Sequence, residues 1–277
     1  MKLINILFLL LLSITFQAQE VETVKTNKGK VYGFWGWNRG WFTNSDLHFI
    51  GNNYDFTLNN IVAKDRQSPF DLGVYFGTTT LTIPQYNFRL GYFLNNNIDI
   101  SIGVDHMKYV MVEEQETEIS GKIDNGSEFD GIYENTPFQT NQRFLKFEHT
   151  DGLNYLNVEL TYNKNLLGLL KIKNNPNKFE INYLAGAGLG AMMPRSNVTL
   201  MSNKKNDEFH FAGYGFAAKL GLNLTFYQYF FIRSEYKGGF TNLPDIRTTE
   251  DPADKASQHF WFTQLNINFG FSFNPFN

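Results

Sequence analysis

Residues 261–273 read WFTQLNINFGFSF, and this stretch decides the fold. Apolar and polar residues alternate through it. Successive side chains of a β-strand point to opposite faces, so this period of two predicts a strand with one apolar and one polar face. The apolar face carries Leu265, Ile267, Phe269, Phe271 and Phe273, and the polar face carries Gln264, Asn266, Asn268, Gly270 and Ser272.

Seven further stretches are predicted as strands in the same way. Most are long enough to cross a membrane, which takes about 9–11 residues of a tilted strand. Together with 261–273 they predict eight antiparallel strands. The seven lie at 31–42, 85–94, 98–104, 154–162, 179–191, 212–225 and 232–240.

The polar faces of these strands indicate a membrane barrel. In a soluble sandwich the polar face would be rich in Lys, Glu and Asp. Here it consists mainly of Gly, Asn, Gln and Ser, with a few charges of both signs. Small polar residues fit the interior of a narrow barrel, and the apolar face suits lipid. We therefore predict an all-β, transmembrane, antiparallel up-and-down β-barrel of eight strands, or of ten if 44–82 adds a membrane hairpin.

The connections support this fold, because outer-membrane barrels alternate long external loops with short periplasmic turns. Short turns are predicted at 94–97 and 226–229. The connection at 163–177 is long for the periplasmic side and is the exception. We also expect the strands to extend above the bilayer. The long external loops are expected at about 44–82, 112–151, 195–208 and 242–258.

Composition agrees with the barrel and excludes several other classes. The 28 Phe, 14 Tyr and 4 Trp make up 17% of the 277 residues, and charged residues only 18%. With no cysteine, a disulfide scaffold and a cysteine nucleophile are excluded. The net charge of −3 gives no indication of nucleic-acid binding.

The N-terminus predicts export. Lys2 precedes an apolar run at 4–16, and Ala18 is a suitable last residue before cleavage. That run is too short for a spanning helix, which needs about 20 residues. We expect residues 1–18 to be a signal peptide, 19–277 to form a single barrel domain, and the mature chain to reside in the outer membrane.

The C-terminal end carries a family resemblance. Phe269, Phe271, Phe273 and Phe276 are similar to the aromatic-rich last strand of outer-membrane barrels, although Asn277 follows the final aromatic. With the predicted signal and the eight strands, the chain resembles the small OmpA-type outer-membrane barrels from about residue 28 to 276. The resemblance implies architecture and no particular function.

One candidate site is a set of charges on the inward parity. In a narrow lumen, opposite charges are expected to pair, because an unpaired buried charge is costly. The set is either a structural plug of ion pairs or a narrow ion path. It consists of Arg89, Asp105, Glu159, Lys219, Arg233, Glu235 and Lys237.

The five histidines form a second pattern at the external ends of the strands. Parity places His149 inward and three others outward, so they do not converge, and no HxH or HxxxH spacing is present. We predict no metal site and no cofactor. The histidines are His48, His106, His149, His210 and His259.

The run from Glu148 to Gly152 faintly resembles the His-x-Ser-Asn-Gly run of outer-membrane lipid A deacylases and phospholipases. In those families the serine is the nucleophile and the histidine activates it. Here Asp151 stands in place of the serine and Gly152 in place of the asparagine. A speculative catalytic rim would comprise His149, Asp151, Asp105 and His106, and a polar outer rim is the alternative.

These observations lead to three functional hypotheses. The first is a structural, adhesion or assembly-partner role, with an outer-membrane protein bound through the external loops. The acidic run at 113–118 is either a solvated loop or part of such a contact. The alternatives are a hydrolase acting on lipid A or phospholipid at the outer rim, and a narrow small-solute pore. Outer-membrane lipid and lipopolysaccharide are the other expected partners, and nucleic acid is not.

Overall fold

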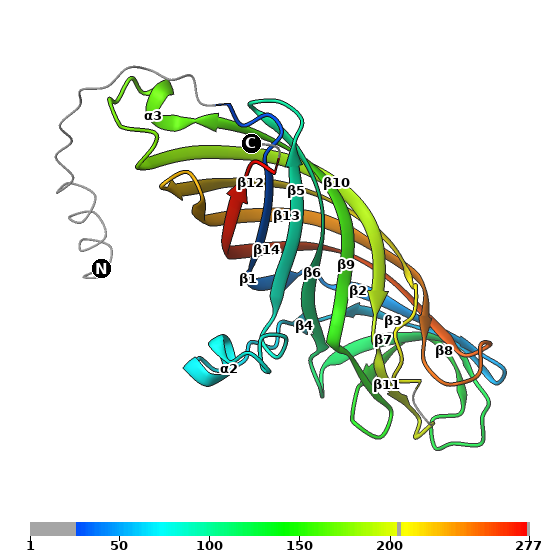
Figure 1. Ribbon diagram of the computed structural model, residues 1–277. Helices are drawn as coiled ribbons and strands as arrows, with labels where there is room; N and C mark the ends of the chain where they lie inside the picture. Colours follow the sequence, from blue (N-terminus) through cyan, green and yellow to red (C-terminus); the bar gives the residue numbers. More distant parts are fainter. Residues whose placement is uncertain (1–25, 204–205, 276–277) are drawn as a thin grey trace, which may run out of the picture.

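Eight antiparallel strands close into a ring, which we call the wall (Figure 1). The computed structural model describes residues 26–203 and 206–275, so the predicted signal peptide and Phe276 lie outside the described residues. In ring order the strands are β1 (Val31–Phe42), β5 (Tyr86–Phe93), β6 (Ile98–Met111), β9 (Leu145–Asn165), β10 (Phe179–Pro194), β12 (Gly213–Phe226), β13 (Phe230–Arg247) and β14 (Lys255–Phe273).

The ring closes between the first and last strands. Strand β1 pairs with β14 over its whole length, from Val31 opposite Phe273 to Phe42 opposite Phe262, and its other edge pairs with β5. The prediction of eight strands is confirmed. Segment 44–82 adds no strand to the ring, so the ten-stranded alternative is wrong.

Tight connections lie at one end of the wall, as predicted. At 94–97 the side chain of Asn95 accepts hydrogen bonds from the backbone N–H groups of Asn97 and Ile98. At 226–229 Tyr227 and Gln228 both adopt positive φ, as in a type I′ turn, and the backbone N–H of Tyr229 donates to the carbonyl of Phe226. The longer connection at 163–177 contains α3 (Leu166–Leu169).

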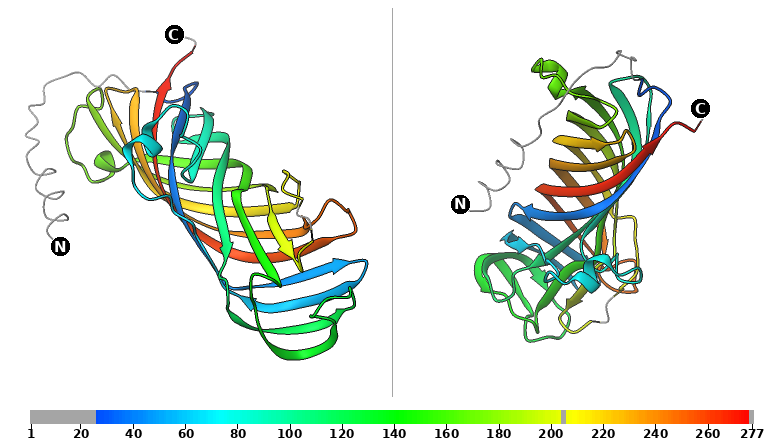
Figure 2. Two further views of the ribbon diagram at one scale, coloured as in Figure 1. Left: turned by 90° about the horizontal axis from the view of Figure 1, so that it is seen from below. Right: turned by 60° about the vertical axis from the view of Figure 1, so that its left-hand side comes forward.

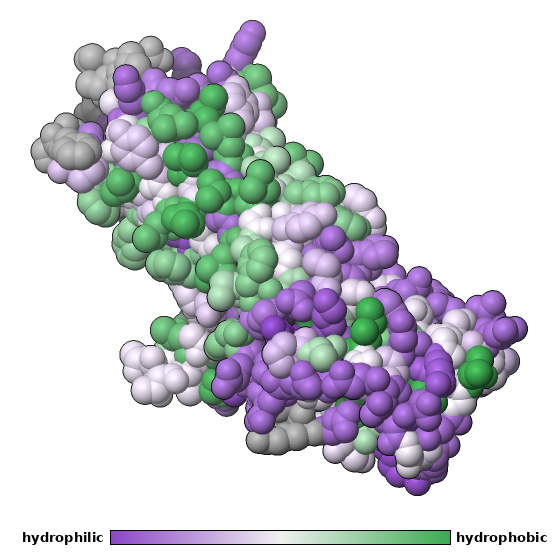
Figure 3. Space-filling model, turned by 90° about the vertical axis from the view of Figure 1, so that its right-hand side faces the viewer, coloured by the Kyte–Doolittle hydropathy of each residue, from purple (hydrophilic) through white to green (hydrophobic). Residues whose placement is uncertain are grey.

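The wall is apolar outside and polar inside, which is the inverse of a soluble protein. Figure 3 shows apolar side chains gathered over the wall and hydrophilic side chains gathered at the other end of the molecule, beyond the wall. This distribution is that of a barrel crossing a membrane. Among the described residues, no helix has the length and hydropathy needed to cross a membrane. Exposed apolar side chains on the wall include Leu90, Ile102, Leu160, Leu189, Leu220 and Ile267.

Beyond the wall, at the end opposite α3, the chain forms a second body that we call the lobe (Figures 1 and 2). It combines six additional strands with the ends of β6, β9, β13 and β14. Strand β2 replaces β1 as the partner of β14 at 255–258. The additional strands are β2 (Ser45–Gly51), β3 (Tyr54–Ile61), β4 (Ala63–Lys64), β7 (Glu116–Ile123), β8 (Gly131–Gln139) and β11 (Asn197–Leu200).

The structure differs from the prediction of long external loops. Segments 44–82, 112–151 and 195–208 were expected as loops, and each contains strands of the lobe. The strands run β14–β2–β3–β7–β8 on one side, with β4–β6–β9–β11 as the other group. These segments fold because they have their own apolar interior, which loops in water lack.

The lobe is built around a large aromatic core. Tyr109 and Phe260 stack at 5.0 Å, and Phe49 and Phe56 stack at 5.2 Å. On β14 the inward parity carries Gln264 within the wall and Phe260 within the lobe. The interior therefore changes from polar to apolar along one strand, without a change of parity. Buried aromatic residues of this core are Phe49, Tyr54, Phe56, Tyr109, Phe144, Phe147, Tyr155, Phe260 and Phe262.

Candidate functional site

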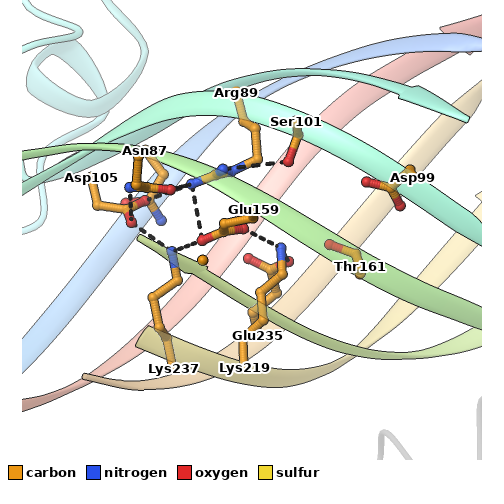
Figure 4. Close-up of polar contacts among 12 residues, drawn as sticks. Asn87, Arg89, Asp99, Ser101, Asp105, Glu159, Thr161, Lys219, Glu235 and Lys237 are labelled. Atoms are coloured by element: carbon orange, nitrogen blue, oxygen red, sulfur yellow. Dashed lines mark hydrogen bonds and ion pairs between the residues drawn. The ribbon is translucent and has the colours of Figure 1, made fainter. Parts of the chain in front are cut away.

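Six charged side chains from five strands meet in the middle of the wall, and we call them the charge network (Figure 4). All six are buried. Each occupies an inward-facing position of its strand, so its burial follows from the alternation of inward and outward side chains along the strand. The network comprises Arg89 on β5, Asp105 on β6, Glu159 on β9, Lys219 on β12, and Glu235 and Lys237 on β13.

Glu159 is the centre of the network, because three cations contact its carboxylate. Nζ of Lys237 lies 2.6 Å from Oε1, Nη2 of Arg89 lies 3.1 Å from Oε1, and Nζ of Lys219 lies 2.7 Å from Oε2. Lys237 also contacts Asp105 at 2.5 Å. Lys219 also contacts Glu235 at 2.9 Å. These contacts cross the lumen from one side of the ring to the other.

Neutral side chains hold the network in place. The guanidinium of Arg89 donates to the side-chain oxygen of Asn157 at 2.7 Å, and Asn157 in turn donates to Asp105 at 3.2 Å. Ser101 accepts a longer hydrogen bond from Arg89. Bonds of this kind satisfy buried donors and acceptors that would otherwise destabilise the fold.

The seventh predicted charge, Arg233, is held mainly by aromatic rings. Its guanidinium carbon lies 5.0 Å from the ring centroids of Tyr32 and Phe231 and 5.2 Å from that of Phe34, an arrangement we call the cage. Glu235 is 3.9 Å away, and the side-chain oxygen of Asn223 accepts a hydrogen bond from Arg233. A desolvated cation against aromatic faces is a favourable cation–π contact. The sequence contains the residues of the cage, because Phe231 lies two positions before Arg233, and Tyr32 and Phe34 lie two positions apart in β1. The cage itself was not predicted.

The interior is therefore filled at three levels. The cage lies near the end with the tight turns, the charge network lies in the middle, and the aromatic core of the lobe lies beyond it. Outside the cage, a recess lined by polar residues such as Asn163, Glu180 and Asn223 has a volume of about 30 Å³.

The four residues of the speculative catalytic rim do not form a common site. Asp105 belongs to the charge network. His106 faces outward, where its ring stacks on Tyr86 and Nδ1 lies 2.8 Å from the side-chain oxygen of Asn154. Asp151 is exposed and forms an ion pair with Arg195 at 3.4 Å. On β6 and β9, His106 is opposite Asn154, and His149 is opposite Tyr109.

His149 has a serine partner that the sequence did not reveal. The hydroxyl of Ser196, which precedes β11, lies 2.8 Å from Nδ1 of His149. Both residues are buried, and the rings of Tyr109 and Phe147 contact the imidazole. Burial lowers the pKa of His149 to about 3, so the ring is neutral at physiological pH. The two residues are 47 positions apart in the sequence, and no motif marks the pair.

The other histidines are spread over the surface of the molecule. Nε2 of His48 lies 2.8 Å from Asp55, and Nε2 of His210 lies 2.8 Å from Asp245. His259 is exposed near the ring of Phe240. Within 26–203 and 206–275, no three His, Asp or Glu side chains gather in a way that would hold a metal ion.

The outside of the lobe is polar, and recesses lie on it. One, of about 650 Å³, lies over β3, β7 and β8, and Glu116 and Glu118 of the predicted acidic run line it together with Phe138. Another, of about 560 Å³, lies among loop tips that include Asp251 and Asp254. Strand β8 forms the end of its sheet. The lobe surface therefore combines polar recesses with the exposed edge of a sheet.

Comparisons with known proteins show no matching family model and no matching curated protein. Among solved structures, OprG from Pseudomonas aeruginosa is similar at 8% identity and a TM-score of 0.37, over 89% of this chain and 97% of that one. Neisserial surface protein A is similar at 6% identity and 0.35, over 90% and 99%. The Yersinia pestis attachment invasion locus protein Ail, solved with the heparin analogue sucrose octasulfate, is similar at 10% identity and 0.31, over 89% and 99%. At such low TM-scores these similarities do not bear on what this chain does.

Proposed function

We propose that the protein is an outer-membrane barrel that anchors the lobe at the cell surface, where the lobe takes part in adhesion or in assembly with another envelope protein. The observation that carries the proposal is the contrast between the two bodies. The wall is filled by the cage and the charge network, whereas the lobe is a folded unit with its own core and a polar surface.

The orientation of the barrel in the membrane follows from the structures at the two ends of the wall. Tight turns at 94–97 and 226–229 lie at one end, and the lobe lies at the other. Short turns are typical of the periplasmic side and long segments of the external side, so we place the lobe outside the cell. The predicted signal peptide supports export of the chain, and outer-membrane lipid and lipopolysaccharide would surround the wall.

The two alternative functions receive less support. A small-solute pore would need a passage where Arg89, Glu159 and Lys237 are in contact. A hydrolase of lipid A or phospholipid would need a substrate to reach His149 and Ser196, which are buried in the lobe. The filled lumen and the buried His149–Ser196 pair both favour a role in which the barrel presents the lobe at the cell surface, which we call the display role, over transport or hydrolysis.

Photo-cross-linking in the native cell tests the display role. A photoreactive amino acid replaces Ile132 on β8, which is 79% exposed, or Leu220 on the wall, which is 66% exposed and serves as the matched control. We expect position 132 to form discrete protein adducts, and position 220 to form adducts with lipid alone. The purified protein in a planar bilayer should show no steady conductance.

The opposite result would contradict the proposal. Steady channels from the purified protein, with protein adducts absent at 132, would favour the pore. The hydrolase has its own assay, since His149→Gln should then abolish deacylation of lipid A or phospholipid measured by mass spectrometry. We expect no such turnover from the wild-type protein.

A further inference from the structure

An apolar arm, residues 66–84, leaves the junction of wall and lobe and carries α2 (Leu72–Phe76) on the outside of the barrel (Figures 1 and 2). Its two ends are fastened together. The carboxylate of Asp65 accepts hydrogen bonds from the backbone N–H of Gly40 at 2.9 Å and from the side chain of Gln85. Near the far end, Nζ of Lys108 donates to the carbonyl of Ile83 at 2.7 Å.

Internal hydrogen bonds give the arm a defined shape. Asp71 caps α2 by accepting from the backbone N–H of Val74 at 3.0 Å. The hydroxyl of Tyr75 donates to the carbonyl of Ser68 at 2.8 Å, and that of Thr80 donates to the carbonyl of Gly73 at 2.7 Å. The arm is therefore a folded element with a defined backbone course.

The arm packs on the lipid-facing side of the wall. The rings of Tyr75 and Phe76 lie 5.5 and 5.0 Å from the ring of Trp37, which stands on the outward parity of β1. Trp37 is opposite Ile267, one of the exposed apolar residues of β14. Tryptophans typically mark the membrane interface, and exposed Trp41 and Trp261 lie nearer the lobe. From Trp41 to Trp37, a strand tilted by about 40° descends about 10 Å.

At that depth the arm presents apolar side chains outward. Phe70, Leu72 and Phe76 are 75%, 67% and 57% exposed. From 68 to 84 the sequence has one charged residue, Asp71, and its carboxylate is used by the cap. Trp37 also links the arm to the apolar surface of the wall, because its ring lies 5.8 Å from that of the exposed Phe269.

We infer that the arm is immersed in the outer leaflet of the membrane and that Phe70, Leu72 and Phe76 contact the acyl chains of that leaflet. The arm adds a second membrane contact to that of the wall, and it is tied to the lobe. Nη2 of Arg66 forms an ion pair with the buried Glu148 of β9 at 2.9 Å. The lipid contact of the arm therefore adds to the wall in holding the lobe at one height and tilt above the bilayer, whichever partner the lobe binds.

Single-cysteine labelling tests the immersion, and the absence of native cysteine makes the labels specific. The variants are Leu72→Cys and Phe76→Cys on the arm, Leu220→Cys on the wall and Ile132→Cys on the lobe. Each carries a fluorescent label and is reconstituted into phosphatidylcholine vesicles. Quenching by lipids brominated on the acyl chains is compared with quenching by aqueous iodide, and a heat-modifiable gel shift verifies that each variant is folded.

We expect brominated lipid to quench the labels at 72 and 76 about as strongly as the label at 220, and several-fold more than the label at 132. Iodide should give the reverse order. The inference is overturned if iodide quenches the arm labels as it does the label at 132. It is equally overturned if neither quencher reaches them, because the arm would then be covered by protein. Neither result depends on whether the lobe binds a partner.

Discussion

Replacing Glu159 by Gln removes the anion at the centre of the charge network. In the wild-type protein this carboxylate contacts Lys237 at 2.6 Å, Lys219 at 2.7 Å and Arg89 at 3.1 Å. The amide is nearly isosteric, so the change alters charge and leaves volume almost unchanged. The three cations would then share Asp105 and Glu235 as their remaining acidic neighbours in the network.

The expected cost follows from the burial of these groups. Breaking a buried ion pair on one side destabilises a protein by about 3–5 kcal/mol, because it leaves an uncompensated charge away from water. Three contacts to one carboxylate place Glu159→Gln near the upper end. With a urea slope of about 2 kcal/mol per molar, a loss of about 5 kcal/mol lowers the unfolding midpoint by about 2.5 M.

Urea unfolding of the protein in lipid vesicles, followed by tryptophan fluorescence and by the heat-modifiable gel shift, measures this loss. The same substitution at Glu118, an exposed residue of β7, is the matched control and should change stability by no more than about 0.5 kcal/mol. The double variant Glu159→Gln with Lys219→Met removes one charge of each sign, and we expect it to regain part of the lost stability.

The reasoning is refuted if Glu159→Gln unfolds at the same urea concentration as the Glu118 control. It is also refuted if removing Lys219 in addition makes the protein less stable than the single variant. Either outcome would mean that the network does not behave as a set of mutually compensating buried charges.

Three further predictions concern other levels of the molecule. Burial lowers the pKa of His149 to about 3, whereas the imidazole of the unfolded chain is protonated near pH 6.5, so the free energy of unfolding should fall as the pH drops below 6.5, by about 2 kcal/mol at pH 5. Urea midpoints at pH 7 and pH 5 measure this change, and a His149→Gln variant that keeps the full pH dependence would contradict the prediction. Phe147→Ala should cost about 3–5 kcal/mol within the lobe core, so limited proteolysis should cleave the lobe faster while the gel shift of the wall persists. Gly36→Ala would bring its Cβ to 2.1 Å from the carbonyl oxygen of Ile267 and should destabilise the ring by about 1–3 kcal/mol, whereas Gly238→Ala, with no atom within 4 Å of the added Cβ, should leave the urea midpoint unchanged.

The wall was predictable because one physical rule governs all of it. Each ring strand alternates with a period of two, and its polar face carries residues small enough for a narrow lumen. Residues such as Asn266 and Ile267 therefore revealed both the strand and its two environments. Pairing of the inward charges also follows from their burial, although the alternation does not say which charge meets which.

The lobe was harder to predict because alternation identifies two faces without saying which one water contacts. In β3 the residues Tyr54, Phe56 and Leu58 alternate as clearly as those of β14, yet here the apolar side faces inward. The Ser196–His149 pair joins distant segments through the pairing of β9 and β11. Register between such segments depends on tertiary packing and leaves no local signal.

Continuity of the long strands has a mechanical consequence. Strands β13 and β14 run from the wall into the lobe and remain paired on both sides of the junction, with one register shift between Leu243 and Ile246. Ladder hydrogen bonds lie perpendicular to the strands, so a pull on the lobe along the strand direction loads many of them in parallel, as shear. A force on the lobe along the strands would therefore be distributed over the hydrogen bonds of the whole wall. Because no hinge would give way first, the protein would resist extraction from the membrane.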